Sequence, residues 1–267
     1  MTQRTAKKET SAHTAREPER SMIQRVAAIM SAFKGNDRTL SVSEIGRRSD
    51  IPKASASRII ADLVEVGFLE RVGDKVSLGM RLFELGERAM RPSDLKKFTL
   101  PSMAELRNAT RQTVHLAVLE GHEVVYVQIL RSSLTPPLPS RVGGRLPAYA
   151  TGVGKALLAF SPPEIVDELL SQPLKALTPR TITNPDVLRA QFVEIRENHV
   201  AFEREESTAS VGCAAAPILD YVGKPIAAIS VSGHLDHIDL GRLGPAIATS
   251  AMALTREAAR INFSAVS

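Results

Sequence analysis

The first 50 residues alternate helical hydrophobic patterns with turn residues. From about Glu19 to Phe33, apolar side chains recur every three or four positions, which predicts a helix with one buried face. The polar stretch GNDRT ends that pattern. Ser41, followed three residues later by Glu44, then predicts a capping box that opens a short second helix.

The next segment predicts a third helix and a β-hairpin. Pro52 suits the first turn of a helix, and the apolar face of the segment ends at Gly67. Residues 68–79 show two short strand patterns on either side of Gly73 and Asp74. A helix, a short helix, a tight turn, a helix and a hairpin together predict a winged helix-turn-helix domain.

Beyond the hairpin the pattern predicts a larger α+β domain. Residues 80–91 have helical periodicity up to Pro92, and a further helix is expected over residues 93–110. Strand patterns then occupy residues 113–121, 123–130, 200–207, 212–220 and 225–233, and helical ones 163–171, 185–198 and 238–262. Because neighbouring strand segments are joined by short turns, we expect an antiparallel sheet with helices packed on one face.

These patterns divide the chain into four parts. Residues 1–18 are polar and predict a disordered tail, and residues 19–79 form the winged helix. Residues 80–92 are expected to be a linker helix, and residues 93–267 the larger domain. The fold class is therefore α+β.

Composition and charge narrow the functional classes. Of 267 residues, 43% are hydrophobic, and no apolar run approaches the ~20 residues of a membrane helix. The N-terminus has no apolar core for a secretory signal, so a cytoplasmic protein without a membrane partner is expected. The single cysteine, Cys213, allows neither an internal disulfide nor a cysteine metal cluster.

The net charge of +5 lies entirely in the first part of the chain. Up to Arg91 there are 17 Lys and Arg against 12 Asp and Glu, and the remainder has 17 of each. A basic N-terminal domain joined to a neutral larger one favours a polyanion as the partner of the first.

Several polar residues of the winged helix are placed to contact DNA. The third helix is expected to read the major groove, where Arg58 can bind guanine with two hydrogen bonds. Basic residues outside that helix are placed to neutralise phosphates. The predicted DNA-binding residues are Arg47, Arg48, Lys53, Ser55, Ser57, Arg58, Arg71 and Lys75.

The chain from about residue 20 to its end resembles the IclR-type transcriptional regulators. The resemblance rests on LSVSEIGRRSDIPKASASRIIADLVEVGFLERVGDKVSLGMRLFELG, then GGRLPAYATGVGKALLAF, TITNPDVLRAQFVEIRENHVAFEREES and VGCAAAPILDYVGKPIAAISVSG, in that order. It implies a ligand-responsive repressor or activator of a catabolic or metabolic operon. Such a protein binds a pseudo-palindromic operator in double-stranded DNA as a homodimer, with dimers pairing into a tetramer.

The same resemblance implies a GAF-like effector domain, in which a curved antiparallel sheet encloses a small carboxylate or aromatic acid. Strand alternation independently places Ser230 and Ser232 on one face, where both hydroxyls can bind one carboxylate. Cys213 and Glu203 match positions that line the family's pocket, and a helix N-terminus near residue 152 favours an anion. The predicted effector-binding residues are Thr151, Gly152, Val153, Glu203, Cys213, Ser230 and Ser232.

A second hypothesis is an enzyme domain fused to a DNA-tethering winged helix, since ATGVGKALLA looks like a phosphate-binding loop. The Walker A pattern fails, however, because Tyr149 replaces its first glycine and Ala156 its hydroxyl residue. Lys155 is therefore expected to be a surface or packing residue. No catalytic set stands out, and no cofactor is expected.

Other polar clusters carry weaker signals. HLDHID at 234–239 has two histidines without further ligands, which favours a solvated loop over a metal site. EREE at 203–206 is expected to be a charged strand edge, and His115 is too isolated in sequence to assign.

Overall fold

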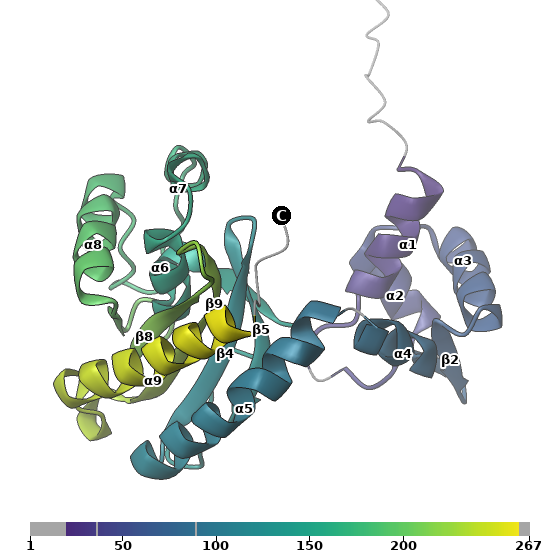
Figure 1. The fold of residues 1–267 in the computed structure, drawn as a ribbon. Helices are drawn as coiled ribbons and strands as arrows, with labels where there is room; N and C mark the ends of the chain where they lie inside the picture. Colours follow the sequence, from purple (N-terminus) through teal and green to yellow (C-terminus); the bar gives the residue numbers. More distant parts are fainter. Residues whose placement is uncertain (1–19, 36, 89, 262–267) are drawn as a thin grey trace, which may run out of the picture. The chain divides into compact units, whose positions relative to one another are not determined.

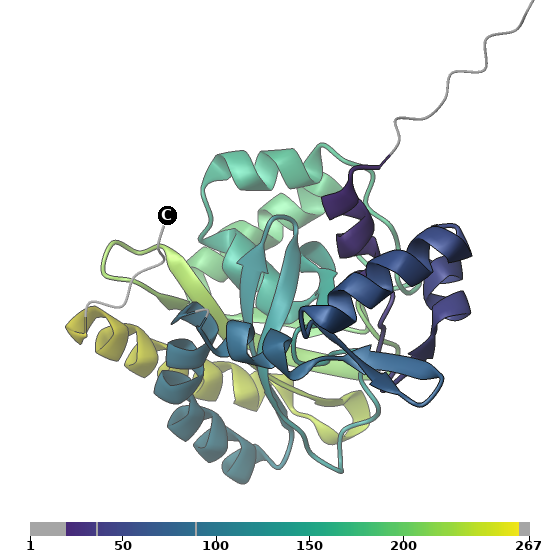
Figure 2. The same ribbon diagram turned by 90° about the vertical axis from the view of Figure 1, so that its right-hand side faces the viewer.

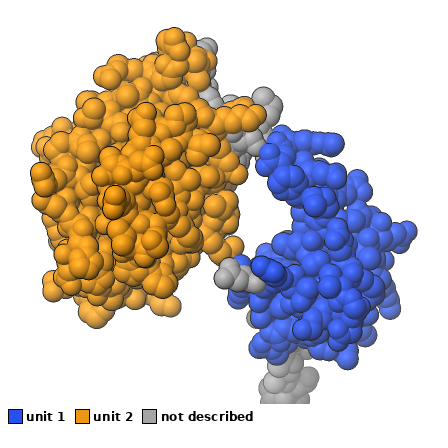
Figure 3. All heavy atoms as spheres, turned by 90° about the horizontal axis from the view of Figure 1, so that it is seen from below, with its two compact units in different colours: residues 1–88 blue, residues 89–267 orange. Residues whose placement is uncertain are grey.

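The computed structural model describes residues 20–35, 37–88 and 90–261. The predicted disordered tail, residues 1–18, lies outside this range. The chain divides into two compact units, residues 1–88 and residues 89–267, which Figure 3 distinguishes by colour. No helix of the described residues is long and apolar enough to cross a membrane.

The first unit is a winged helix-turn-helix, as the sequence predicts (Figure 1). Its three strands form a small antiparallel sheet in the order β1-β3-β2. Strand β1 has only two residues, too few for a periodic pattern. The elements are α1 (Met22–Ser31), β1 (Leu40–Ser41), α2 (Val42–Ser49), α3 (Lys53–Glu65), β2 (Leu69–Val72), β3 (Lys75–Leu78) and α4 (Met80–Arg88).

Helix caps in this unit differ in detail from the prediction. The Ser41 hydroxyl accepts the backbone N–H of Glu44 at 3.2 Å, which is half of the predicted capping box. The Glu44 carboxylate does not complete the box, because it accepts hydrogen bonds from arginine side chains of the same helix. A complete capping box occurs instead at Ser21, which pairs with Gln24 at the start of α1.

The junction after the winged helix also differs. Helix α4 ends at Arg88, and helix α5 (Met90–Thr110) begins before Pro92. Proline is tolerated in the first turn of a helix, where its missing N–H has no intrahelical partner to lose. Pro92 therefore lies inside a helix and does not stop one. The predicted linker segment 80–92 contains the whole of α4 and the start of α5.

The second unit contains a six-stranded antiparallel sheet in the order β6-β5-β4-β9-β8-β7. Its strands are β4 (Thr113–Glu120), β5 (Glu123–Leu130), β6 (Arg145–Pro147), β7 (Ala201–Arg204), β8 (Val211–Leu219) and β9 (Pro225–His234). The other elements are the short 3₁₀ turns Ala148–Ala150 and Leu235–His237, and the helices α6 (Gly152–Ala159), α7 (Pro163–Leu170), α8 (Pro185–Asn198) and α9 (Leu240–Arg260).

Helices cover both faces of this sheet, so the expectation of a single covered face was wrong (Figures 1 and 2). One core packs α6, α7 and α8 against the face that carries Ala228. The other core packs α5 and α9 against the face that carries Ile229 and Val231. Both faces of β8 and β9 are buried, so the polar face that Ser230 and Ser232 form on β9 lies inside the domain and does not face solvent.

The two glycines at the start of α6 allow it to approach the sheet and the preceding turn closely. A Cβ on Gly152 would lie 2.8 Å from the Cys213 sulfur, and one on Gly154 would lie 2.1 Å from the carbonyl oxygen of Ala148. These glycines therefore serve packing, which explains a glycine-rich loop that lacks the other residues of a nucleotide site.

Replacing Gly154 by alanine is expected to destabilise the protein by about 1–3 kcal/mol, because the new methyl group must displace the backbone at Ala148. Urea unfolding followed by circular dichroism measures the change. Gly86→Ala is the matched control, since no atom lies within 4 Å of its Cβ and alanine favours a helix. Equal stability of the two variants would contradict the packing role.

Candidate effector pocket and DNA interface

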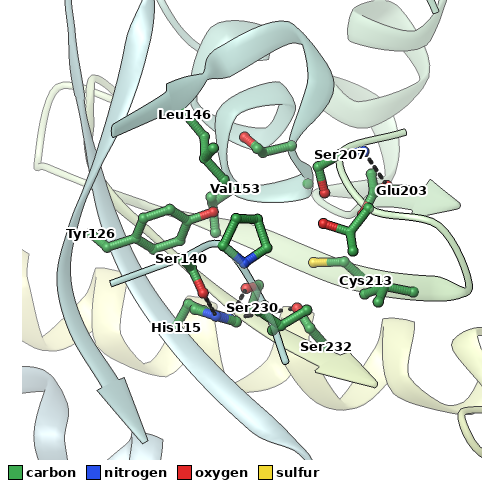
Figure 4. A pocket seen from close by; sticks show the side chains of 16 residues that line it. His115, Tyr126, Ser140, Leu146, Val153, Glu203, Ser207, Cys213, Ser230 and Ser232 are labelled. Atoms are coloured by element: carbon green, nitrogen blue, oxygen red, sulfur yellow. Dashed lines mark hydrogen bonds between the residues drawn. The ribbon is translucent and has the colours of Figure 1, made fainter. Parts of the chain in front are cut away.

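A cavity in the second unit opens between the sheet, the N-terminus of α6 and two loops (Figure 4). In this structure the cavity has a volume of about 30 Å³, space for little more than a water molecule, so an organic ligand must widen it by displacing side chains or loops. All seven residues predicted to bind an effector line this one cavity. The tertiary structure thus brings together positions that are up to 81 residues apart in the sequence.

Strand pairing explains how these side chains meet. Glu203 of β7 lies opposite Cys213 of β8, which in turn lies opposite Ser232 of β9. Ser230 of β9 lies opposite His115 of β4. Directly paired residues on adjacent strands point to the same face of a sheet. Four strands therefore present these polar side chains to the same cavity.

His115, which the sequence alone does not assign, lies on β4 at one side of this group. It is 3% exposed, its Nε2 lies 3.0 Å from the Ser140 hydroxyl, and its Nδ1 lies 3.5 Å from the hydroxyls of both Ser230 and Ser232. Burial, with a smaller effect of Arg131, lowers the pKa of His115 to about 3. The ring is therefore neutral at physiological pH, with one nitrogen as donor and the other as acceptor.

The remaining pocket residues come mostly from loops that have no periodic pattern. Leu138, Pro139 and Ser140 belong to the connection between β5 and β6. Arg131 fixes this connection by donating from Nη2 to the Ser140 carbonyl oxygen at 2.5 Å. Thr135 also fixes it, donating from its hydroxyl to the Ser232 carbonyl oxygen at 3.2 Å.

Tyr126 of β5 supplies an aromatic wall, with its ring centroid 5.3 Å from that of His115. Burial raises its pKa, so the phenol stays protonated. The alternation of β5 could have predicted the face on which Tyr126 lies, since Val124 and Tyr126 belong to the core that contains α6 and Val127 belongs to the other core.

The N-terminus of α6 meets the expectation of an anion-favouring site only in part. The Thr151 side chain caps the helix by accepting the Gly154 N–H at 3.1 Å. Its own N–H is already used, since it donates to the Ala148 carbonyl oxygen at 3.3 Å. The N–H groups of Gly152 and Val153, in the first turn, have no partner within the helix.

Glu203 is buried, contrary to the expectation of a charged edge at 203–206. Strand β7 is the edge of the sheet, but the following loop folds back over it and leaves Glu203 2% exposed. Its Oε1 accepts the N–H groups of Glu206 and, at 3.1 Å, Ser207. Burial raises the pKa of Glu203 to about 7, against the lowering effect of these two backbone donors.

Lys155 is fully buried, so the prediction of a surface residue was wrong and that of a packing residue is the better description. Its Nζ lies 2.6 and 2.5 Å from the two carboxylate oxygens of Glu206 and 2.9 Å from Oε1 of Gln191. Helix α6 is buried all round, which is typical of a helix that is apolar on every face. That pattern could have predicted a buried lysine with a carboxylate partner.

The histidine-rich segment after β9 forms no metal cluster. His234 caps the short turn Leu235–His237 by accepting the Asp236 N–H at 3.2 Å. Within residues 20–35, 37–88 and 90–261, no group of three or more His, Cys, Asp and Glu side chains is arranged to hold a metal ion.

On the winged helix, α3 has the two faces that its sequence predicts. Lys53, Ser57 and Arg58 are exposed and Ser55 is half-buried. The opposite face packs into the core of the unit through Ala56, Ile59 and Ile60.

The two arginines of α2 differ in their availability to DNA. Arg48 donates to Glu44 at 2.6 Å, to Asp37 at 2.5 Å and to the Ala32 carbonyl oxygen, and its side chain is 24% exposed. Its charge is thus neutralised within the unit, which favours a role in holding α2 to the end of α1. Arg47 also pairs with Glu44 but remains 72% exposed.

The hairpin residues Arg71 and Lys75 are both exposed. Arg71 pairs with Val76, and Lys75 pairs with Val72. Since neighbouring residues of a strand point to opposite faces, Arg71 and Lys75 extend from opposite sides of the hairpin. The hairpin can therefore contact phosphates on either side.

Comparison with known proteins gives consistent matches over both units. The family model described as IclR helix-turn-helix domain matches residues 22–73, and the one described as Bacterial transcriptional regulator IclR C-terminal matches residues 87–257. The HTH-type transcriptional regulator KdgR of Escherichia coli is 32% identical over 79% of this chain and 81% of its own length. The Pca regulon regulatory protein of Pseudomonas putida is 30% identical, covering 83% of this chain and 77% of its own.

Among solved structures, an IclR homologue of Microbacterium hydrocarbonoxydans in complex with 4-hydroxybenzoate is similar over 89% of this chain and 100% of its own, with 32% identity and a TM-score of 0.81. The Thermotoga maritima IclR is 28% identical with a TM-score of 0.72, and the match covers 89% of this chain and 98% of that one.

Proposed function

Because the chain belongs to the IclR family of transcriptional regulators, we propose that it controls a catabolic or metabolic operon in response to a small organic acid. The observation that carries this proposal is the single cavity in which all seven predicted effector-binding residues meet. We further propose that it acts in the cytoplasm, where chromosomal DNA is its partner.

Regulators of this family are not enzymes, which sets aside the alternative of a catalytic domain fused to a winged helix. The position of Lys155 supports the same conclusion. A lysine that is fully buried and paired with Glu206 is not available to a nucleotide phosphate.

The pocket has the chemistry expected for an acid. Hydroxyl groups of Ser230 and Ser232 and the N–H groups at the start of α6 can donate hydrogen bonds to a carboxylate. Tyr126, Leu146 and Val153 offer apolar surface to the body of the ligand. The complex of the related Microbacterium protein with 4-hydroxybenzoate supports an effector that is a carboxylate or an aromatic acid.

We infer that a homodimer places two α3 helices in successive major grooves of a pseudo-palindromic operator, and that dimers pair into tetramers. Effector binding would favour one arrangement of the two winged helices over another. Residues 80–92 would transmit this effect from the effector domain to the winged helices. Such coupling requires the effector to bind the two arrangements with different affinity, and either repression or activation is compatible with it.

Two arginine variants test the DNA contacts. Arg58→Ala is expected to lose about 1–3 kcal/mol of binding to the operator and little on unrelated DNA, because base contacts carry specificity. Arg71→Ala should weaken binding to both DNAs alike and reduce its salt dependence, because phosphate contacts carry no sequence information. Gel-shift titrations at several salt concentrations, on DNA upstream of its own and neighbouring genes, measure both effects.

Absence of salt-sensitive binding to any of this DNA would overturn the proposal of a DNA-binding regulator. If Arg58→Ala weakened binding to the operator and to unrelated DNA equally, Arg58 would not contact bases specifically.

A further inference from the structure

Three buried ionisable side chains form a cluster at the wall of the effector pocket. Lys155 and Glu206 are paired through both carboxylate oxygens, and each is at most 4% exposed. Glu203 is the third member, 2% exposed and lining the cavity. The cluster thus contains one cation and two carboxyl groups, and the cation is already neutralised by Glu206.

The two oxygens of Glu203 have different surroundings. Oε1 accepts the backbone N–H groups of Glu206 and Ser207. Oε2 accepts no hydrogen bond from any residue that the structure describes, although the side chain is buried and lines the cavity. This oxygen is therefore available to a ligand.

The other titratable groups that face Glu203 carry no charge near neutral pH. Burial raises the pKa of Cys213, on the paired strand, to about 12, and it also raises the pKa of Tyr126 on β5. His115 on β4 is neutral for the reason given above. With Lys155 and Glu206 compensating each other, Glu203 alone sets the charge at this wall of the pocket.

We propose, building on the proposed function, that the pocket binds an anionic effector together with one proton, and that Glu203 holds this proton. Two carboxylates in one buried site repel each other strongly, so one of them must be neutral. Proton uptake from solvent converts Glu203 from a competing anion into a hydrogen-bond donor that can serve the bound acid.

The proposal fixes the pH dependence of binding. The pKa of Glu203 in the free protein is about 7, and a bound anion raises it further. Below the free value the proton is already in place, and affinity for an acid does not change with pH. Above it each bound anion requires an additional proton, so affinity falls about tenfold per pH unit.

Calorimetric titration tests this with 4-hydroxybenzoate, benzoate and acetate as probes, in phosphate and Bis-Tris at pH 6 and in phosphate and Tris at pH 8. These buffers differ in ionisation enthalpy, so the difference in observed heat gives the number of protons taken up. We expect uptake near zero at pH 6 and near one per bound acid at pH 8.

Glu203→Gln is the decisive variant, because glutamine is neutral at every pH and keeps a hydrogen-bond donor. It should bind the acid at pH 6 about as well as the unsubstituted protein, show no proton uptake, and bind about tenfold more tightly than that protein at pH 8. Glu205→Gln, in the same loop but half-buried and hydrogen-bonded to the Ser210 N–H, is the matched control and should leave the pH profile unchanged.

Binding of an acid without proton uptake at pH 8, or loss of binding by Glu203→Gln at both pH values, would overturn this inference and leave the proposed function intact. Failure of all three acids to bind would overturn both the inference and the assignment of an organic acid as effector.

Discussion

Replacement of Lys155 by methionine is expected to lower the free energy of unfolding by about 3–5 kcal/mol, because it leaves the Glu206 carboxylate buried without its cation. The lysine also links α6 to Gln191 of α8, so the variant loses a contact between two helices of one core. Guanidinium unfolding monitored by circular dichroism measures the difference.

Two further variants separate charge from packing. Lys155→Met combined with Glu206→Met should recover much of the loss, since a buried ion pair can often be replaced by apolar residues at little cost. Arg189→Met breaks a partly exposed pair with Asp167, 2.7 Å in length, and should cost no more than about 1 kcal/mol. If Lys155→Met lowered the free energy of unfolding by less than Arg189→Met does, Lys155 would not be needed to compensate the charge of Glu206.

Combined replacement of Ser230 and Ser232 by alanine is expected to weaken effector binding roughly a hundredfold, since each hydroxyl can donate a hydrogen bond to a charged group. Operator binding without effector should be unchanged, because the serines belong to the second unit and small alanines fit their positions. Thermal-shift screening with aromatic and central-metabolite acids identifies the ligand, and calorimetry with gel shifts then measures both affinities.

Ser171→Ala is the control for this experiment, since Ser171 is exposed and its hydroxyl bonds only to the Glu168 carbonyl oxygen. It should alter neither affinity. If the double variant lost operator binding as strongly as effector binding, the serines would have a folding role in place of a ligand role.

Sequence periodicity was most informative where the two faces of an element carry side chains of different polarity. The inward face of α3, with Ala56, Ile59 and Ile60, follows directly from helical spacing. Ser230 and Ser232 were placed on one face of a strand by alternation, and both line the cavity. In such elements the face on which each residue lies depends on its position within one segment, which the sequence contains.

Periodicity failed where an element is buried on all sides or where a partner is distant. Strand β8 is buried on both faces and carries no alternation, so the pattern did not indicate that helices cover both faces of the sheet. The apolar pattern of α6 is compatible with a buried Lys155, but it does not identify Glu206 as the partner. The ion pairs that neutralise Arg48 likewise depend on the approach of α2 to the end of α1.

The sequence by itself determined the winged helix, the order of the longer helices and strands and the family resemblance, because each of these depends on local spacing or on ordered motifs. The tertiary structure decided which side chains share a site. Only the sheet order β4-β9-β8-β7 places His115 beside Ser230, and only the fold of the loop after β7 buries Glu203 and pairs Glu206 with Lys155. These contacts join residues 51 to 115 positions apart, and burial then sets their charge by removing water, which no local pattern in the sequence encodes.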